Sequence, residues 1–361
     1  MTSFALTLTD RPTPADERVE IVNRPVFGAH FTDHMALATW NTGQGWHDRQ
    51  IAARRPFVLH PGAATFHYGQ EIFEGMKAYR QPDGGVALFR PERNAARFAR
   101  SAERLAMAPL DEDDFVAAVT ELVDVDRDWV PAPDGEQSLY IRPFEIASET
   151  LIGVRAATEY TFCVIASPVG PYYPEPVSLW ATPTYTRAAA GGTGAAKCGG
   201  NYAASLAAAD EAAEHGCQQV VWLDGAEHRW VEECGTMNIL FVTADGQLVT
   251  PALTGTILDG VTRDSILTLA PEHGLRPVQR RIAIEEVFER VTDGTITEVF
   301  ACGTAAVVTP VIAFAAPGDG ADQRFVVGDG TPGPKSQAIR AHLLDIQYGR
   351  VPDAHGWMRR V

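Results

Sequence analysis

The chain has few cysteines, and they form no metal-binding pattern. No C-x-x-C pair and no H-E-x-x-H string occurs, and His60 and His67 are too far apart to form a helical metal pair. An odd, scattered set of cysteines is typical of a protein kept in a reducing cytoplasm. We therefore expect a cytoplasmic protein without a metal site. The five cysteines are Cys163, Cys198, Cys217, Cys234 and Cys302.

Long hydrophobic runs and an excess of basic charge are also missing. No apolar run approaches the roughly 20 residues that a membrane-spanning helix needs. The segment Met1 to Glu20 contains acidic residues and two prolines, and it lacks the basic start and apolar core of a signal peptide. The net charge of −16 argues against nucleic acid, because phosphates attract a basic surface. We expect small-molecule partners, with neither a membrane nor a nucleic acid.

The length of 361 residues, with 45% hydrophobic and 21% charged residues, is typical of a globular protein with two domains. Four prolines and one glycine between Pro168 and Pro176 indicate the domain boundary. We predict a smaller N-terminal α/β domain over 1–170, a linker or lid over 171–185, and a larger cofactor-binding domain over 186–361. Alternating strand and helix patterns in both halves predict an α/β or α+β enzyme.

Hydrophobic periodicity predicts helices and strands in both halves. The expected helices cover 92–108, 111–125 with Asp111 as N-cap, 202–215, 261–269 and 336–348. The expected strands cover 28–31, 35–40, 58–59, 138–144, 161–167, 219–223, 238–243, 247–250 and 298–302. The segment 317–333, rich in Gly, Asp and Pro, is expected to be an exposed loop.

Lys197 is the residue that most clearly indicates chemistry, because glycines flank it on both sides and Glu233 follows at the end of an apolar run. A lysine amine can form a Schiff base with pyridoxal phosphate, and a carboxylate can keep the pyridine nitrogen of that cofactor protonated. The segment contains neither a Walker A motif nor a G-x-G-x-x-G string. A solvated loop lysine remains the alternative at this point, and neighbouring Glu232 is an alternative to Glu233.

Several strings of residues, in one order, resemble those of the branched-chain amino acid aminotransferases, pyridoxal phosphate enzymes of fold type IV. The resemblance runs from about Phe27 to Trp357. It implies a two-domain fold, with a smaller α/β domain and a larger pseudo-barrel domain, and a homodimer. The strings include Phe73-Glu-Gly-Met-Lys77, Tyr140-Ile-Arg-Pro143, Lys197-Cys-Gly-Gly-Asn-Tyr202, Glu233-Cys-Gly-Thr236, Asp259-Gly-Val-Thr-Arg263 and Gly303-Thr304.

The resemblance implies specific contacts with pyridoxal 5'-phosphate. Lys197 would hold the cofactor covalently and move the substrate proton, Glu233 would pair with the pyridine nitrogen, and Tyr202 would bond the phenolic oxygen. Backbone N–H groups at the predicted helix start at Val261 would favour the phosphate. Arg97 would be a charged phosphate donor, although Arg93, Arg100 and Arg104 share its helix. The remaining expected cofactor contacts are Thr236, Leu258, Thr262 and Thr304.

The resemblance also implies an apolar substrate pocket with two carboxylate-binding groups. Backbone N–H groups of Thr304 and Ala305 would lie near the substrate carboxylate, and Arg142 would bind the distal carboxylate of glutamate or 2-oxoglutarate. The linker around Tyr172 would close over the pocket. For each pocket aromatic, plain core packing is the alternative. The expected aromatic residues are Phe31, Tyr68, Phe73, Tyr140 and Tyr172.

The implied activity is reversible amino transfer between L-leucine, L-isoleucine or L-valine and 2-oxoglutarate. Within the same fold, a D-amino-acid transaminase or an aminodeoxychorismate lyase is the alternative. A noncatalytic phosphate- or nucleotide-binding protein is the alternative from another class. Some animal members carry a C-x-x-C after the Gly-Thr string, where this chain has Ala306 and Thr309, so we expect no thiol regulation there.

Overall fold

The computed structural model describes residues 4–133, 135–172 and 175–361, and the chain forms two compact units. The first unit contains Met1–Tyr172, Ala196–Gly199 and Leu344–Val361, and the second contains Tyr173–Ala195 and Gly200–Leu343. Residues 173 and 174 of the predicted linker lie outside the described residues. Two segments that we placed in the large domain, Ala196–Gly199 and Leu344–Val361, therefore make their main contacts in the first unit.

The first unit is built on one mixed sheet, whose strand order is β1-β3-β2-β8-β7-β5-β6-β18, with β4 paired to β7. The long strands β7 and β8 run antiparallel at its centre, from Ser138↔Val169 to Ala147↔Tyr160. The strands are β1 (Ala5–Leu6), β2 (His34–Asn41), β3 (Gly45–Ala53), β4 (Glu71–Phe73), β5 (Met76–Arg80), β6 (Val86–Phe89), β7 (Ser138–Ala147), β8 (Glu159–Val169) and β18 (Met358–Arg360).

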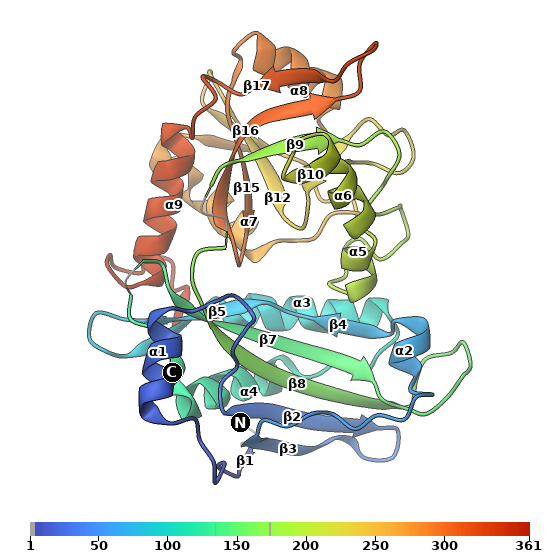
Figure 1. Ribbon diagram of the computed structural model, residues 1–361, viewed down its shortest axis with the longest axis vertical. Helices are drawn as coiled ribbons and strands as arrows, with labels where there is room; N and C mark the ends of the chain where they lie inside the picture. Colours follow the sequence, from blue (N-terminus) through green and yellow to red (C-terminus); the bar gives the residue numbers. More distant parts are fainter. Residues whose placement is uncertain (1–3, 134, 173–174) are drawn as a thin grey trace. The chain divides into compact units, whose positions relative to one another are not determined.

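Helices α3 (Pro91–Arg104) and α4 (Glu112–Val125) pack on this sheet (Figure 1). Their core contact is aromatic: the Phe98 ring centroid lies 5.2 Å from that of Phe115 and 5.6 Å from that of Phe162 on β8. Asp111 caps α4 as predicted, because its side chain accepts a hydrogen bond from the backbone N–H of Asp113. The other helical segments of this unit are α1 (Ala15–Asn23), α2 (Ala64–Tyr68) and the short η1 (Arg127–Trp129).

The second unit is built on another mixed sheet, in the order β11-β10-β9-β16-β15-β12-β13-β14, with β17 paired to β16. β9 runs parallel to both β10 and β16, whereas β15 runs antiparallel to β12 and β16. The strands are β9 (Val177–Ala181), β10 (Gln219–Leu223), β11 (Val231–Cys234), β12 (Asn238–Thr243), β13 (Gln247–Thr250), β14 (Arg276–Gln279), β15 (Ile296–Gly303), β16 (Val307–Ala316) and β17 (Gln323–Val326).

The helices of the second unit pack on its core through buried apolar residues. Ala208 and Ala212 of α6 (Leu206–Glu214) pack with Trp180 and Trp222, and Val287 of α8 (Ile284–Thr292) joins the main core. The short helix η2 (Ala270–His273) follows α7 (Val261–Leu269) directly. Two helices, α5 (Gly199–Ala203) and α9 (Pro334–Gln347), cross the division between the units. Within the described residues, no helix is long and apolar enough to cross a membrane.

The predicted secondary structure agrees best in the second half of the chain. The predicted bounds of α7, β10, β12 and β13 match the structure, because turn residues bound each short apolar run. The predicted strands at 28–31 and 58–59 are wrong, since both segments are irregular. The predicted loop 317–333 contains strand β17, and the predicted helix 202–215 is divided between α5 and α6.

Candidate active site

The backbone around Lys197 is fixed by three hydrogen bonds within the first unit. The Lys197 N–H donates to the Ser101 hydroxyl on α3 at 3.0 Å, and the Phe73 N–H donates to the Lys197 carbonyl at 2.9 Å. Two residues further on, the Gly199 N–H donates to a carboxylate oxygen of Glu71 on β4 at 2.5 Å. These long-range bonds explain why a segment distant in sequence groups with the first unit.

The Phe73 ring lies against two cations. The Lys197 ammonium nitrogen is 4.7 Å from the ring centroid, and the guanidinium carbon of Arg142 is 4.8 Å from it. Arg142 donates through Nη2 to the Tyr140 hydroxyl at 3.0 Å. Its Nε is buried and has no hydrogen-bond partner among the described residues. The Arg142 guanidinium therefore lies on the same Phe73 ring as Lys197, and its Nε–H has no partner among the described residues.

Tyr140 belongs to a chain of aromatic rings that the sequence predicted only in part. Its ring centroid lies 5.1 Å from that of Phe27, and Phe27 lies 4.9 Å from Tyr172. A glycine is required at position 75, because a Cβ there would lie 2.2 Å from the Tyr140 hydroxyl oxygen. Phe27 was not among our predicted site residues, since it stands in an irregular segment without a motif. The other two predicted aromatics have different neighbours: Phe31 lies beneath Arg54, and Tyr68 contacts His67.

Arg97 is the buried arginine of α3, which distinguishes it from Arg93, Arg100 and Arg104. Its Nε and Nη2 donate to the two carboxylate oxygens of Glu74, at 2.7 and 2.8 Å. The Asn94 amide, one helical turn earlier, also donates to Glu74 at 2.8 Å. Our expectation that Arg97 binds a phosphate remains a prediction, and the structure adds a buried ion pair to its role.

Arg97→Ala is expected to destabilise the protein by roughly 3–5 kcal/mol, because it leaves the buried Glu74 carboxylate without its charge partner. Denaturant unfolding of the cofactor-free protein measures this loss. The double variant Arg97→Ala/Glu74→Gln removes the stranded charge, so it should recover part of the stability. If the single and double variants are equally unstable, the ion pair is not the origin of the effect.

The charge state of Glu74 also sets a pH window for stability. Burial, the largest single effect, raises the pKa of Glu74, but the charge and hydrogen bonds of Arg97, the charge of Lys197 and the Asn94 amide together hold the pKa below its usual value of 4.5. A carboxylate with a lowered folded-state pKa contributes stability above the unfolded-state pKa, and this contribution is lost as the pH falls through the folded-state pKa. The contribution of the pair is therefore complete at neutral pH and disappears in acid.

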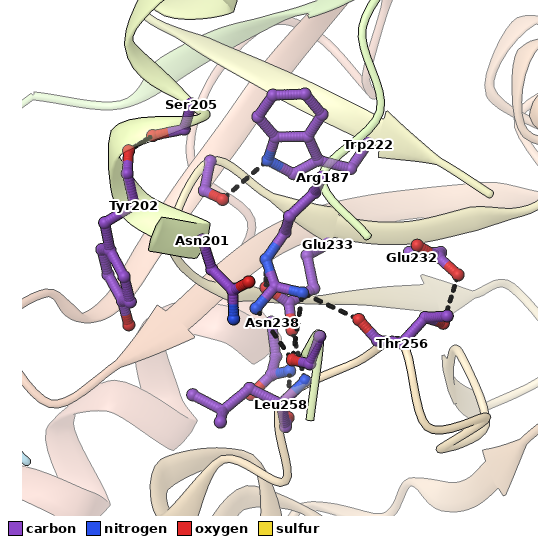
Figure 2. A network of polar contacts seen from close by, with 12 residues as sticks. Arg187, Asn201, Tyr202, Ser205, Trp222, Glu232, Glu233, Asn238, Thr256 and Leu258 are labelled. Atoms are coloured by element: carbon purple, nitrogen blue, oxygen red, sulfur yellow. Dashed lines mark hydrogen bonds and ion pairs between the residues drawn. The ribbon is translucent and has the colours of Figure 1, made fainter. Parts of the chain in front are cut away.

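Glu233 occupies the centre of a polar network in the second unit (Figure 2). One carboxylate oxygen accepts a hydrogen bond from the Leu258 N–H at 2.6 Å, and the other lies 2.9 Å from Nε of Arg187. Arg187 is held in turn by the Thr256 carbonyl, to which Nη1 donates at 2.7 Å. Both charged side chains are almost completely buried. Arg187 was not predicted, since the sequence shows only an arginine ahead of the glycine-rich segment.

Glu232 has different surroundings, as expected from the alternation of side chains along β11. It accepts a hydrogen bond from the Thr256 hydroxyl, and it lines a separate cavity of about 150 Å³ together with Asp224 and Trp230. Burial raises the pKa of Glu232 above its usual value. The two adjacent glutamates therefore belong to different environments, and Glu233 is the one held by a buried cation.

The N-terminus of α7 is a second polar feature of this unit. No side chain of the described residues caps it, and its first residues, Val261 and Thr262, are buried. Unpaired backbone N–H groups at a helix start favour an anion. The turn before the helix is tightly packed: Asn238 donates to the Leu258 carbonyl at 3.0 Å, and a Cβ at Gly260 would lie 2.0 Å from the Asn238 amide oxygen.

The remaining predicted residues lie at turns and at a helix in the second unit. Thr236 lies in the turn between β11 and β12, whereas Thr304 and Ala305 lie in the turn between β15 and β16. Tyr202 lies on α5, where its carbonyl accepts a hydrogen bond from the Ser205 hydroxyl at 2.7 Å (Figure 2). These positions are compatible with ligand contacts, and their predicted roles remain predictions.

The residues fit the chemical groups of pyridoxal 5'-phosphate. Lys197 offers an amine for the aldehyde, the buried Glu233 offers a carboxylate for a ring nitrogen, and the uncapped start of α7 offers donors for a phosphate. Each of these groups is set by contacts within its own unit. An uncapped, buried helix start is a costly feature in a protein without a ligand for it.

A scan against family models identifies "Amino-transferase class IV" over residues 71–314. The chain is 52% identical over 350 residues to the "Probable branched-chain-amino-acid aminotransferase" of Streptomyces coelicolor, covering 96% of this chain and 95% of that protein. It is 49% identical over 364 residues to the branched-chain-amino-acid aminotransferase of Mycolicibacterium smegmatis, covering 99% and 98%.

Solved structures show the same similarity. The branched-chain amino acid aminotransferase from Escherichia coli matches with a TM-score of 0.70 and 28% identity, covering 90% of this chain and 98% of that one. A branched-chain amino acid aminotransferase of T.th., solved with pyridoxamine 5'-phosphate, matches with a TM-score of 0.71 and 28% identity over the same shares. The T.th. enzyme has also been solved as a complex with N-(5'-phosphopyridoxyl)-L-glutamate.

Proposed function

This chain belongs to the class IV aminotransferases, and from that premise we propose that it exchanges amino groups between L-leucine, L-isoleucine or L-valine and 2-oxoglutarate. The enzyme is a branched-chain-amino-acid aminotransferase, with the α/β, two-domain architecture of fold type IV. The full-length similarity to branched-chain enzymes favours this substrate class over the D-amino-acid transaminase and lyase alternatives.

Pyridoxal 5'-phosphate is the cofactor of this proposal. When bound, it supplies an electron-withdrawing ring that stabilises negative charge at the α-carbon of the substrate. The Lys197 amine would hold the cofactor and would take the proton from that carbon. Glu233, which pairs with Arg187 and accepts the Leu258 N–H, would accept a hydrogen bond from the ring nitrogen. The uncapped N–H groups of α7 would bind the phosphate, and the resemblance gives the Arg97 guanidinium the same role.

The main support for the proposed substrates is that both Lys197 and Arg142 lie against the Phe73 ring. An apolar substrate side chain can pack on Phe73 and Tyr140 beside the reacting lysine. A distal carboxylate can instead bond the Arg142 donor that no described residue satisfies. By the resemblance, backbone N–H groups of Thr304 and Ala305 would bind the carboxylate that all these substrates share. The face of the first unit that carries Phe73 and Arg142 can therefore accept both apolar and acidic side chains.

Arg142→Ala is expected to slow the half-reaction with glutamate or 2-oxoglutarate far more than the half-reaction with leucine. Without the guanidinium, the distal carboxylate loses a charge-assisted hydrogen bond of roughly 1.5–3 kcal/mol in a partly dry pocket, which corresponds to about 10–150-fold. Single-turnover absorbance of the bound cofactor follows each half-reaction separately. An equal decrease in both half-reactions would show that Arg142 supports the pocket structurally and does not bind the acidic substrate.

A homodimer is part of the proposal, supported by exposed apolar side chains in the first unit. Val58, Phe66, Ile152 and Val154 are between 62% and 97% exposed. The bridge between Ala63 and Thr150 brings the two segments that carry them together. Exposed apolar residues gathered in this way are typical of a protein–protein interface. Light scattering of the purified enzyme measures the oligomeric state directly.

A further inference from the structure

Glu71 lies on β4, on the face of the sheet that also carries Phe73. Neither the family resemblance nor the proposed reaction assigns a role to Glu71. On β4 it precedes Phe73 by two residues, so both side chains project from one face, whereas Ile72 between them is completely buried on the other face. Glu71 pairs with Ile146 of β7, and Arg142 lies further along the same strand. Glu71 is half-buried in this position.

One oxygen of Glu71 is committed to the lysine segment. It accepts the Gly199 N–H at 2.5 Å, and a Cβ at Gly199 would lie 2.1 Å from this oxygen. A residue larger than glycine at position 199 would therefore displace the carboxylate. The bond can be kept whether Glu71 is ionised or protonated, because a carboxylic acid retains a carbonyl oxygen that accepts.

The charge of Glu71 is coupled to that of Arg142. Burial raises the pKa of Glu71, and the Gly199 N–H and the positive charge of Arg142 only partly oppose this increase. Glu145 on β7 projects to the opposite face, and Glu74 is paired with Arg97. The other charged or titratable groups on the elements around Glu71 include Tyr140 on β7, Lys197 and Cys198 on the lysine segment, Arg100 and Arg104 on α3, and His67 and Tyr68 on α2.

We propose that Glu71 is a specificity-determining residue, which balances the charge of Arg142 when the substrate side chain is apolar and takes up a proton when a distal carboxylate binds to Arg142. The proton comes from solvent, forms an O–H bond on the Glu71 carboxylate, and returns to solvent when the dicarboxylate leaves. The inference rests on the proposed function of Arg142 as the site for that distal carboxylate.

The physical reason is that the single positive charge of Arg142 can balance the negative charge of one carboxylate but not of two. With an apolar side chain in the pocket, the negative Glu71 offsets Arg142, and the substrate does not meet an uncompensated charge. When a second carboxylate arrives, like charges in a half-buried site repel, so protonation of Glu71 becomes more favourable. By linkage, binding of a dicarboxylate then takes up protons at Glu71, and its affinity decreases as the pH rises. Binding of a monocarboxylate leaves the protonation of Glu71 unchanged, so Glu71 gives it no such pH dependence.

Calorimetry of the holoenzyme with two substrate analogues tests this inference. Glutarate carries a distal carboxylate, and 4-methylvalerate has an apolar end. Titrations at constant pH in buffers of different ionisation enthalpy give the number of protons taken up on binding. We expect a larger proton uptake for glutarate than for 4-methylvalerate at pH 7, and up to about a tenfold loss of glutarate affinity per pH unit above the pKa of Glu71.

Glu71→Gln is the decisive variant, because the amide oxygen can still accept the Gly199 N–H while the charge is removed. The difference in proton uptake between the two analogues should vanish, and glutarate should bind at least about tenfold more tightly at pH 8. Glu71→Ala, which removes both the charge and the acceptor for the Gly199 N–H, should also abolish the difference in proton uptake. Agreement between the two variants would assign the effect to the charge and not to the hydrogen bond. A difference in proton uptake that persists in both variants would overturn the role of Glu71, as would an equal loss of affinity for both analogues.

Arg142→Ala separates this inference from the function on which it rests. If Arg142→Ala binds glutarate as well as the unmodified enzyme does, the proposed acidic-substrate contact is itself wrong. If Arg142→Ala weakens glutarate binding and Glu71→Gln leaves the proton uptake unchanged, the contact stands and only the proposal about Glu71 fails.

Discussion

Lys197→Ala is expected to lose at least about 10⁴-fold in turnover, because the substitution removes the group that we propose both as the amine holding the cofactor and as the base taking the substrate proton. Acid–base catalysis by one positioned side chain contributes about 10²–10⁴-fold by itself. The measurement is kcat for leucine and 2-oxoglutarate at saturating cofactor. The visible absorbance of the lysine-bound cofactor should disappear in the same variant.

The fold should survive this change. The Lys197 segment is held by backbone hydrogen bonds to Ser101, Phe73 and Glu71, and none of them uses the lysine side chain. Thermal unfolding of the cofactor-free variant should therefore resemble that of the unmodified protein. Near-normal turnover by a folded Lys197→Ala would exclude the proposed mechanism.

Glu233→Gln is expected to reduce kcat by about 10²–10³-fold at saturating cofactor, since a neutral amide cannot stabilise the positive charge of the ring nitrogen. The amide oxygen can still accept the Leu258 N–H, but the ion pair with Arg187 is lost. Because Arg187 is then left buried without a charge partner, we also expect some loss of stability, which denaturant unfolding measures.

Glu232→Gln is the matched control for this prediction. Glu232 is the adjacent glutamate, but it bonds the Thr256 hydroxyl and lines a different cavity. Its kcat should remain within a few-fold of that of the unmodified enzyme. If Glu232→Gln is the inactive variant and Glu233→Gln is active, the assignment of the ring-nitrogen partner is wrong by one residue.

The sequence predicted local features better than long-range ones. Helix α7 was predicted with its bounds, because Asp259 and Gly260 mark its start and the apolar spacing continues to Leu269. Strand β16 was missed: Pro310, which lacks an N–H, lies within it opposite Phe300, and proline argues against a strand. Helix α8 was also missed, although it contributes Val287 to the core.

The same distinction applies to the candidate site. Lys197 and Glu233 stand in recognisable strings, and the resemblance assigned them roles. Their supporting partners come from distant parts of the chain: Ser101 lies 96 residues from Lys197, and Leu258 lies 25 residues from Glu233. Arg187 and Glu71 have no local motif, so only the folded structure could show that one pairs with Glu233 and the other bonds Gly199.

Lys197 is the residue that we propose to hold the cofactor, and this assignment is simple to test because the chain contains three lysines, Lys77, Lys197 and Lys335. Lys77 is buried on β5, and Lys335 donates to the His273 carbonyl at 2.7 Å. Borohydride reduction of the holoenzyme fixes the cofactor to the amine that holds it, and peptide mass mapping then locates the added mass. We expect modification of Lys197 alone. Modification of Lys77 or Lys335 in its place, or of no lysine, would contradict it.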